Sequence, residues 1–258
     1  MTKITNVSTV SVEIPYEHGG PKAGWGGQSW NKLSILMVKV ETEDGYTGWG
    51  EGFSYNCRAA VKAAVENMVA PVVIGMDSGD IAGISRDMQQ KLHLFGRYGI
   101  TIFALSALDI ALWDIAGKRA GVPLHRLLGG AARTRVPGYA SLLKYRDAEL
   151  VGENVAKARS EGYDAIKIHE TEVPEVAAAR DAAGEGIPLM VDTNCPWTPE
   201  QARIMAGKLW EFDLHWLEEP ISHPRISMPS RDWGARAEYQ SRREKMPALR
   251  SSSRRCSM

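Results

Sequence analysis

The chain has 258 residues, which suffices for one large domain or two smaller ones with a buried core. Hydrophobic residues make up 44% and charged residues 24%, and the net charge of zero provides no basic field for nucleic acid. There is no apolar leader and no run of 18 apolar residues, and the three cysteines lack pairing or metal spacing. We therefore expect a cytoplasmic protein with no nucleic-acid partner and no membrane partner.

The first half of the chain predicts strands followed by helices. Asp44-Gly45 is a strong hairpin signal between the second strand and "YTGWGE". Gly121 and Pro123 end a long apolar helix. The strands are expected over residues 4–14 and 33–42, and the helices over residues 58–75, 80–94 and 101–121.

From about residue 136, predicted strands and helices alternate with a period of roughly 25 residues. This alternation is typical of βα units with parallel strands. The alternation stops at Pro224. The strands are expected over residues 136–141, 164–169, 187–194 and 214–220, and the helices over residues 147–161, 172–183 and 198–211.

Ionisable side chains lie at the ends of three successive strands. In "YDAIKIHE", Lys167 and His169 share one face because side chains in a strand alternate. Asp192 and Asn194 share a face in "VDTN", and Glu218 lies in "LEEP". In βα barrels the active site collects at the carboxyl ends of the strands. Each residue alone also has a structural interpretation, such as a helix N-cap for Asp192, but buried charges at three strand ends favour a site.

Two carboxylates that face one centre are hard oxygen ligands of the kind that Mg²⁺ prefers. A cation beside Lys167 would lower the pKa of that lysine toward a usable range. A Lys/His pair next to Mg²⁺ suits abstraction of a proton α to a carboxylate, because the cation offsets the negative charge that develops.

Several segments, in order, resemble the enolase superfamily, and specifically its mandelate racemase-like subgroup. They are "DGYTGWGE", "ALSALDIALWDIAGKRAGVPLHRLLGG", "KIH", "VDTN" and "WLEEP", and the resemblance covers residues 3–224. It implies an α+β capping domain over residues 1–128. It also implies roughly the first half of a (β/α)₇β barrel, a TIM-type barrel, over residues 129–224.

The resemblance also implies roles for the strand-end residues. By position, Asp192 and Glu218 look like two ligands of Mg²⁺, 26 residues apart as one βα unit requires. Lys167 matches the first lysine of the family's K-x-K motif. His169 stands where the second lysine, usually the base, would be, and histidine can serve as a base at neutral pH.

Substrate contacts are expected from two places. Asn194 looks like a polar partner near the metal or the substrate. The glycine-rich segment 17–30, "EHGGPKAGWGGQSW", resembles a mobile capping loop that closes over the substrate, and its glycines permit movement. Trp25 or Trp30 of that loop could line the pocket; the alternative is an exposed turn.

Residues 225–258 differ from the rest of the chain. They carry nine basic and three acidic residues, a net charge of +6 that balances −6 over residues 1–224. Glu244 lies 26 residues after Glu218, but "SRREKMPALR" does not resemble a buried strand, so we treat that spacing as coincidence. The family's third acidic ligand and later acid/base groups have no counterpart. We interpret the chain as truncated or frameshifted after about residue 224, and expect little or no turnover, that is, an inactive chain.

The leading functional hypothesis is descent from a Mg²⁺-dependent lyase or isomerase that removes the proton α to the carboxylate of a hydroxy or sugar acid. A sugar-acid dehydratase is the first choice and a racemase the next. Two alternatives stay open: a cycloisomerase of the muconate-lactonizing type, and a non-catalytic fragment or interaction protein whose basic tail binds an acidic surface. Intact members of the family are expected to be homo-oligomers.

Overall fold

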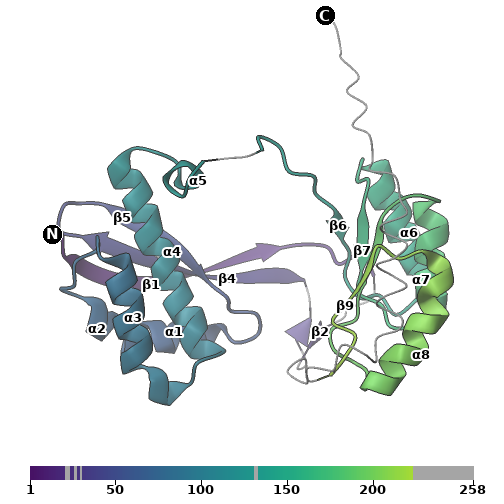
Figure 1. Ribbon diagram of the computed structural model, residues 1–258, viewed down its shortest axis with the longest axis horizontal. Coiled ribbons are helices and arrows are strands. Elements are labelled where there is room, and N and C mark those ends of the chain that lie inside the picture. Colours follow the sequence, from purple (N-terminus) through teal and green to yellow (C-terminus); the bar gives the residue numbers. More distant parts are fainter. Residues whose placement is uncertain (21–23, 26–27, 30, 131–132, 223–258) are drawn as a thin grey trace, which may run out of the picture. The chain divides into compact units, whose positions relative to one another are not determined.

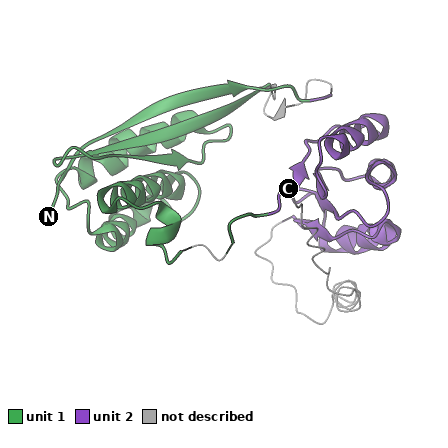
Figure 2. Ribbon diagram, turned by 90° about the horizontal axis from the view of Figure 1, so that it is seen from above, with its two compact units in different colours: residues 1–18, 22–136 green, residues 19–21, 137–258 purple. Residues whose placement is uncertain are grey.

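The computed structural model describes residues 1–20, 24–25, 28–29, 31–130 and 133–222 (Figure 1). The basic tail 225–258, with Glu244, lies outside the described residues. The chain divides into two compact units (Figure 2). Unit 1 comprises Met1–His18 and Lys22–Val136, and unit 2 comprises Gly19–Pro21 and Pro137–Met258. The predicted domain boundary between residues 128 and 129 stays a prediction.

Unit 1 contains an antiparallel sheet in the order β1-β4-β5. Its strands are β1 (Ile4–Pro15), β4 (Lys32–Thr42) and β5 (Thr47–Gly52). The predicted hairpin is present: the Gly45 amide donates to the Thr42 carbonyl, 2.9 Å away, and Gly45 has a φ of +85°. The segment between β1 and β4 also contains two short paired strands, β2 (Gly24–Trp25) and β3 (Gln28–Ser29), which the sequence did not predict.

Helices cover one face of this sheet (Figure 2). The helical segments of unit 1 are α1 (Arg58–Ala64), η1 (Val65–Val69), α2 (Ala70–Val73), α3 (Ile81–Lys91), η2 (His93–Phe95), α4 (Ile100–Ala120) and α5 (Leu124–Leu127). The helix predicted over 58–75 contains a π-helical stretch, η1. Pro71 follows this stretch and lacks an amide hydrogen, so the regular hydrogen-bond ladder cannot run through it.

Helix α4 forms the centre of unit 1. It is long and apolar enough to cross a membrane by length and composition alone. Its buried residues, including Leu108, Leu112 and Ile115, instead pack in one core with Val38 and Val40 of β4. This packing explains a helix that is apolar on most of its surface.

The glycines of "TGWG" let β5 approach α4 closely. A Cβ atom built on Gly50 would overlap the backbone carbonyl of Ala107, and one on Gly48 would overlap that of Ala111. The sheet and the helix backbone are therefore in direct contact, which only glycine allows. The Trp49 amide between them donates to Asp114 Oδ2 of α4, at 2.9 Å.

Substituting Gly50 with alanine is expected to destabilise the protein by about 1–3 kcal/mol or more, because the new methyl group meets backbone atoms that cannot rotate away. Urea unfolding would measure the change. Gly207→Ala is the matched control: it lies in α8 (Pro199–Leu209) with no atom near its added Cβ. That variant should be neutral or stabilised by up to about 1 kcal/mol. Equal unfolding midpoints for the two variants would contradict the packing argument.

Unit 2 contains the predicted parallel sheet, in the order β6-β7-β8-β9. Its strands are β6 (Ala140–Ser141), β7 (Ile166–Ile168), β8 (Leu189–Asp192) and β9 (Trp216–Glu218). The connecting helices are α6 (Ala148–Ser160), α7 (Val173–Ala183) and α8, which continues into η3 (Trp210–Phe212). The strand predicted over 136–141 is reduced to two residues.

The two faces of this sheet differ in chemistry. The helices lie along one face (Figure 1), where Ile166, Ile168 and Val191 belong to the hydrophobic core of unit 2. Strand alternation places Lys167 and Asp192 on the opposite face. Each predicted site residue in a strand therefore points away from the helices.

Candidate functional site

The polar side chains collect at the carboxyl ends of three neighbouring strands. His169 directly follows β7, Asp192 is the last residue of β8 and Glu218 is the last residue of β9. Asp192 and Glu218 are partners in the β8–β9 register, so their side chains leave the sheet side by side. The parallel arrangement brings groups that are up to 51 residues apart in sequence to one place.

Lys167 lies between the two carboxylates. Its Nζ is 3.3 Å from Asp192 Oδ2 and 3.3 Å from Glu218 Oε2. The side chains of Lys167 and Asp192 are 10% and 8% exposed, whereas that of Glu218 is 37% exposed. The ammonium group of Lys167 and the carboxylate of Asp192 thus form a buried ion pair. The carboxylate of Glu218, the second partner of Lys167, is accessible to solvent.

The charge on Lys167 is stabilised by this arrangement. Burial lowers the pKa of the ammonium, but hydrogen bonds and charge attraction from Asp192 and then Glu218 outweigh it, so the pKa of Lys167 is raised. The lowered pKa expected from the sequence assumed a cation beside the lysine. In the structure, the carboxylates of Asp192 and Glu218 lie beside the lysine and raise its pKa instead.

His169 joins the same cluster through Asp192. Its Nε2 is 3.3 Å from Asp192 Oδ2, and its side chain is 20% exposed. Its Nδ1 contacts the carbonyl oxygen of Leu142, which follows β6. Because a carbonyl oxygen only accepts hydrogen bonds, this contact needs a proton on Nδ1, whereas Nε2 faces the carboxylate of Asp192.

Asn194 supports Asp192 from the loop after β8. Its side-chain amide donates to Asp192 Oδ1 at 2.8 Å, and its backbone amide donates to the same oxygen at 3.1 Å. Asn194 has a φ of +55°, a left-handed conformation that asparagine tolerates better than most residues. Asp192 therefore accepts hydrogen bonds on both oxygens, and a substrate contact by Asn194 stays a prediction.

Two aromatic residues that were not predicted complete the polar face. Trp216 Nε1 donates to Glu218 Oε2 at 3.0 Å, the same oxygen that Lys167 contacts. The Tyr139 ring centre is 5.7 Å from Lys167 Nζ, and its ring meets that of Trp216 edge-on at 6.1 Å. A period of two from Glu218 back to Trp216 is the sequence signal that could have identified the tryptophan.

The predicted tryptophans of the capping loop have no described side chain. Trp25 lies in β2, and only its backbone is described. Trp30 lies outside the described residues. Their role in lining a pocket stays a prediction.

The arrangement of Asp192 and Glu218 suits a cation, but it offers few ligands. Asp192 and Glu218 already converge on the positive charge of Lys167, and carboxylates are the hard ligands that Mg²⁺ takes. Within residues 1–222, as far as the structure describes them, no group of three or more His, Cys, Asp or Glu side chains has metal-binding geometry. The described part of the chain thus brings two carboxylates together at this edge of the sheet.

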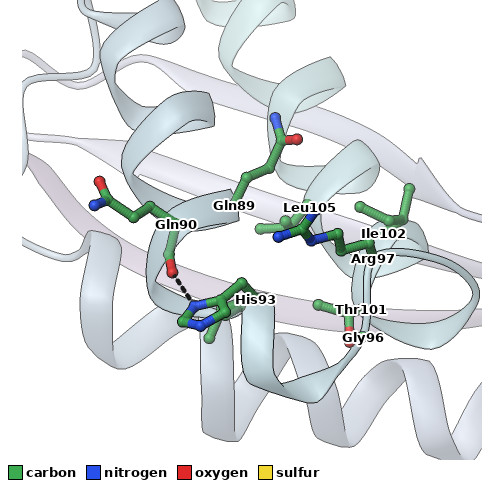
Figure 3. A pocket seen from close by; sticks show the side chains of 9 residues that line it. Gln89, Gln90, His93, Gly96, Arg97, Thr101, Ile102 and Leu105 are labelled. Carbon is green, nitrogen blue, oxygen red and sulfur yellow. Dashed lines mark hydrogen bonds between the residues drawn. The ribbon is translucent and has the colours of Figure 1, made fainter.

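A hollow of about 470 Å³ lies elsewhere, in unit 1 (Figure 3). It lies where α3, η2 and the start of α4 meet, and its lining includes Gln90, His93 and Arg97. His93 Nδ1 is bonded to the Gln90 carbonyl oxygen at 2.7 Å. None of the predicted site residues whose side chains the structure describes is part of this lining.

Comparison with protein families gives two matches along the chain. Residues 25–129 match the family described as mandelate racemase / muconate lactonizing enzyme, N-terminal domain. Residues 150–230 match the family described as enolase C-terminal domain-like. The second match contains Lys167, His169, Asp192 and Glu218.

Individual relatives agree with these matches. Arabinonate dehydratase of Saccharolobus solfataricus is 32% identical over 80% of this chain and 57% of that protein. The 3,6-anhydro-alpha-L-galactonate cycloisomerase of Streptomyces coelicolor is 38% identical over 73% of this chain and 54% of that protein. A crystal structure of an enolase superfamily member from Polaromonas sp. has a TM-score of 0.75 and 31% identity, covering 86% of this chain and 60% of that chain. The chain therefore spans little more than half the length of these relatives.

Proposed function

Because the chain belongs to the mandelate racemase / muconate lactonizing enzyme family of the enolase superfamily, we propose that its strand-end site removes the proton α to the carboxylate of a sugar acid. The observation that carries the proposal is the convergence of Lys167, His169, Asp192 and Glu218 from three strands. The substrate class comes from the relatives, which include an arabinonate dehydratase and an L-talarate/galactarate dehydratase.

Each residue has a distinct role in this proposal. His169 accepts the proton at Nε2, the nitrogen that faces the cluster, because Nδ1 is engaged with the Leu142 carbonyl. Lys167 keeps its charge and stabilises the negative charge that grows on the substrate carboxylate. Trp216 holds Glu218 in place, as Asn194 holds Asp192.

Asp192 and Glu218 would hold Mg²⁺. When bound, the cation would supply a Lewis acid that offsets the negative charge left by proton removal. The carboxylates lie next to Nζ of Lys167 and, for Asp192, next to Nε2 of His169. A substrate carboxylate directed to this edge of the sheet would thus have its α proton close to the base.

A cycloisomerase is the second candidate, and the similarity to the Streptomyces coelicolor enzyme favours it. A dehydratase, a racemase and a cycloisomerase can share the same first proton abstraction and differ in the step that follows. That step needs a further acid or base, so the little or no turnover that we expect of this chain concerns product formation more than proton exchange. Little or no turnover, a cytoplasmic location and homo-oligomeric assembly stay predictions.

Proton exchange in D₂O tests the proposal directly. The chain is incubated with arabinonate, galactonate or galactarate and Mg²⁺, and deuterium at the α carbon is followed by NMR. We expect exchange with at least one acid that stops on chelation with EDTA, and product formation slower than exchange. Product analysis then separates dehydration from cycloisomerisation.

Substitutions distinguish this site from background exchange. Asp192→Asn is expected to abolish the Mg²⁺-dependent exchange, because it removes a charged ligand. Asp181→Asn, on the exposed surface of α7, is the matched control and should exchange at the wild-type rate. Exchange that is absent with all acids, insensitive to EDTA, or retained by Asp192→Asn would contradict the proposal.

A further inference from the structure

Glu170, the last residue of "YDAIKIHE", is a buried carboxylate with no role in the proposal above. Only 1% of its surface is exposed. Its Oε1 accepts from the Tyr145 amide at 2.6 Å and from the Arg146 amide at 3.2 Å, and its Oε2 lies 3.3 Å from the same Arg146 amide. All these donors belong to one turn between β6 and α6.

The same segment also carries the Leu142 carbonyl oxygen, which contacts His169, the proposed base. The Leu142 amide donates to the Lys167 carbonyl at 2.8 Å, and the Leu142 carbonyl accepts from Nδ1 of His169. The segment from Leu142 to Arg146 is thus bonded to β7 and the residues after it at both ends. Glu170 accepts hydrogen bonds from the Tyr145–Arg146 end of this segment, and His169 contacts its Leu142 end.

The turn has a conformation that needs support. Arg146 has a φ of +59°, a left-handed conformation that is uncommon for a residue other than glycine. Asp147 follows as the N-cap of α6 and accepts from the Leu150 amide at 3.0 Å. The amide hydrogens of Tyr145 and Arg146 are therefore directed at Glu170, outside any helix or strand ladder.

Placing a carboxylate there has a cost. Burial raises the pKa of Glu170, and the bonds from the Tyr145 and Arg146 amides and the charge of Lys144 oppose this only in part. An apolar side chain of similar size would fill the same space without this desolvation. Glu170 therefore contributes its acceptor oxygens, and not simply the volume of its side chain.

We propose that Glu170 is a positioning residue for His169: it holds the Tyr145–Arg146 turn so that the Leu142 carbonyl, the closer of two acceptors, takes the proton of the neutral ring at Nδ1 in competition with Asp192 at Nε2. The inference rests on the proposed function only in assigning Nε2 as the base. The tautomer itself is a property of the folded chain and can be measured without a substrate.

The test is ¹⁵N NMR of the full chain with labelled histidine, at a pH where the imidazole is neutral. The chain has six histidines, and the spectrum of His169→Gln identifies the signals of His169. The wild type is expected to show Nδ1–H. Glu170→Ala is expected to lose most of the Nδ1–H signal in favour of Nε2–H, because the segment that carries the Leu142 carbonyl is then held only through the Leu142 amide, and Asp192 remains as the acceptor near Nε2.

Two further variants give the matched comparison. Glu170→Gln keeps an oxygen that can accept from the Tyr145 amide, so it should retain the wild-type tautomer. Glu172→Gln changes an exposed glutamate two residues away, whose side chain contacts Thr171 Oγ1 at 3.4 Å, and should also retain it. If Glu170→Ala does not fold, Glu170→Leu, which keeps the volume and lacks the acceptors, replaces it.

A purely structural role makes a different prediction. It would lower the melting temperature of Glu170→Ala or Glu170→Leu while the folded variant keeps Nδ1–H on His169, and that result would overturn the proposal. A shifted tautomer together with absent proton exchange in the wild type would support the positioning role and reject the proposed function. The two proposals therefore fail on different measurements.

Discussion

Replacing His169 with alanine is expected to lower Mg²⁺-dependent α-proton exchange by about 10²- to 10⁴-fold, the usual contribution of a positioned general base. The reason is geometric: Nε2 of His169 lies 3.3 Å from Asp192 Oδ2, beside the proposed metal ligand, and Nδ1 is already bonded to Leu142. Removing the ring removes the proton acceptor but leaves Lys167 and both carboxylates in place.

The measurement is the initial rate of deuterium incorporation for wild type and variant under the same conditions. His125→Ala changes an exposed histidine of α5 and should retain the full rate. Circular dichroism would show that His169→Ala keeps its secondary structure. A folded His169→Ala that exchanges as fast as the wild type would assign the base to another residue.

Replacing Lys167 with methionine is expected to lower the free energy of unfolding by about 3–5 kcal/mol, the range found when one partner of a buried ion pair is removed. Methionine fills a similar volume, so the loss is one of charge. Asp192, only 8% exposed, and Glu218 would then face each other without a cation between them. Their repulsion adds to the cost of the buried, unpaired Asp192.

Divalent cations should reverse part of this loss. Mg²⁺ bound by Asp192 and Glu218 would replace the missing charge, and saturation at about 100 times the dissociation constant would restore about 2.7 kcal/mol. The wild type should gain less, since its lysine competes for the same carboxylates. Chemical unfolding with and without Mg²⁺ measures both effects.

The pH range of the Lys167 contribution follows from its pKa. Burial lowers the pKa of Lys167, but its bonds to Asp192 and Glu218 raise it further, so the net folded value is above the ordinary value. A raised pKa means that the stabilisation is complete at neutral pH and is lost as the pH rises through the folded pKa. The wild type and Lys167→Met should therefore differ most near neutral pH.

Lys157→Met provides the control for charge removal, because Lys157 is exposed on α6. Its stability should change by less than about 0.5 kcal/mol, as for most surface substitutions. If Lys157→Met and Lys167→Met unfold at the same denaturant concentration, the ion pair does not stabilise the fold. If Mg²⁺ stabilised both variants equally, Asp192 and Glu218 would not be the residues that bind it.

The sequence alone predicted the order of strands and helices and which charged side chains lie at the strand ends. Strand–helix alternation predicted the parallel sheet β6–β9, because right-handed βα units have few other solutions. Alternation within a strand placed Lys167 and His169 on one face, and strand order brought Asp192 and Glu218 beside them. Each of these inferences depends on periodicity, which is a local property of the chain.

Only the tertiary structure decided which atoms meet. The contact of Glu170 with the Tyr145–Arg146 turn depends on a left-handed residue and a loop conformation that no period specifies. The same holds for the carbonyl that selects the His169 tautomer, and for Trp216 and Tyr139 beside Lys167. Periodicity assigns a side chain to a face, whereas hydrogen-bond partners depend on register and loop geometry, which the packed structure alone determines.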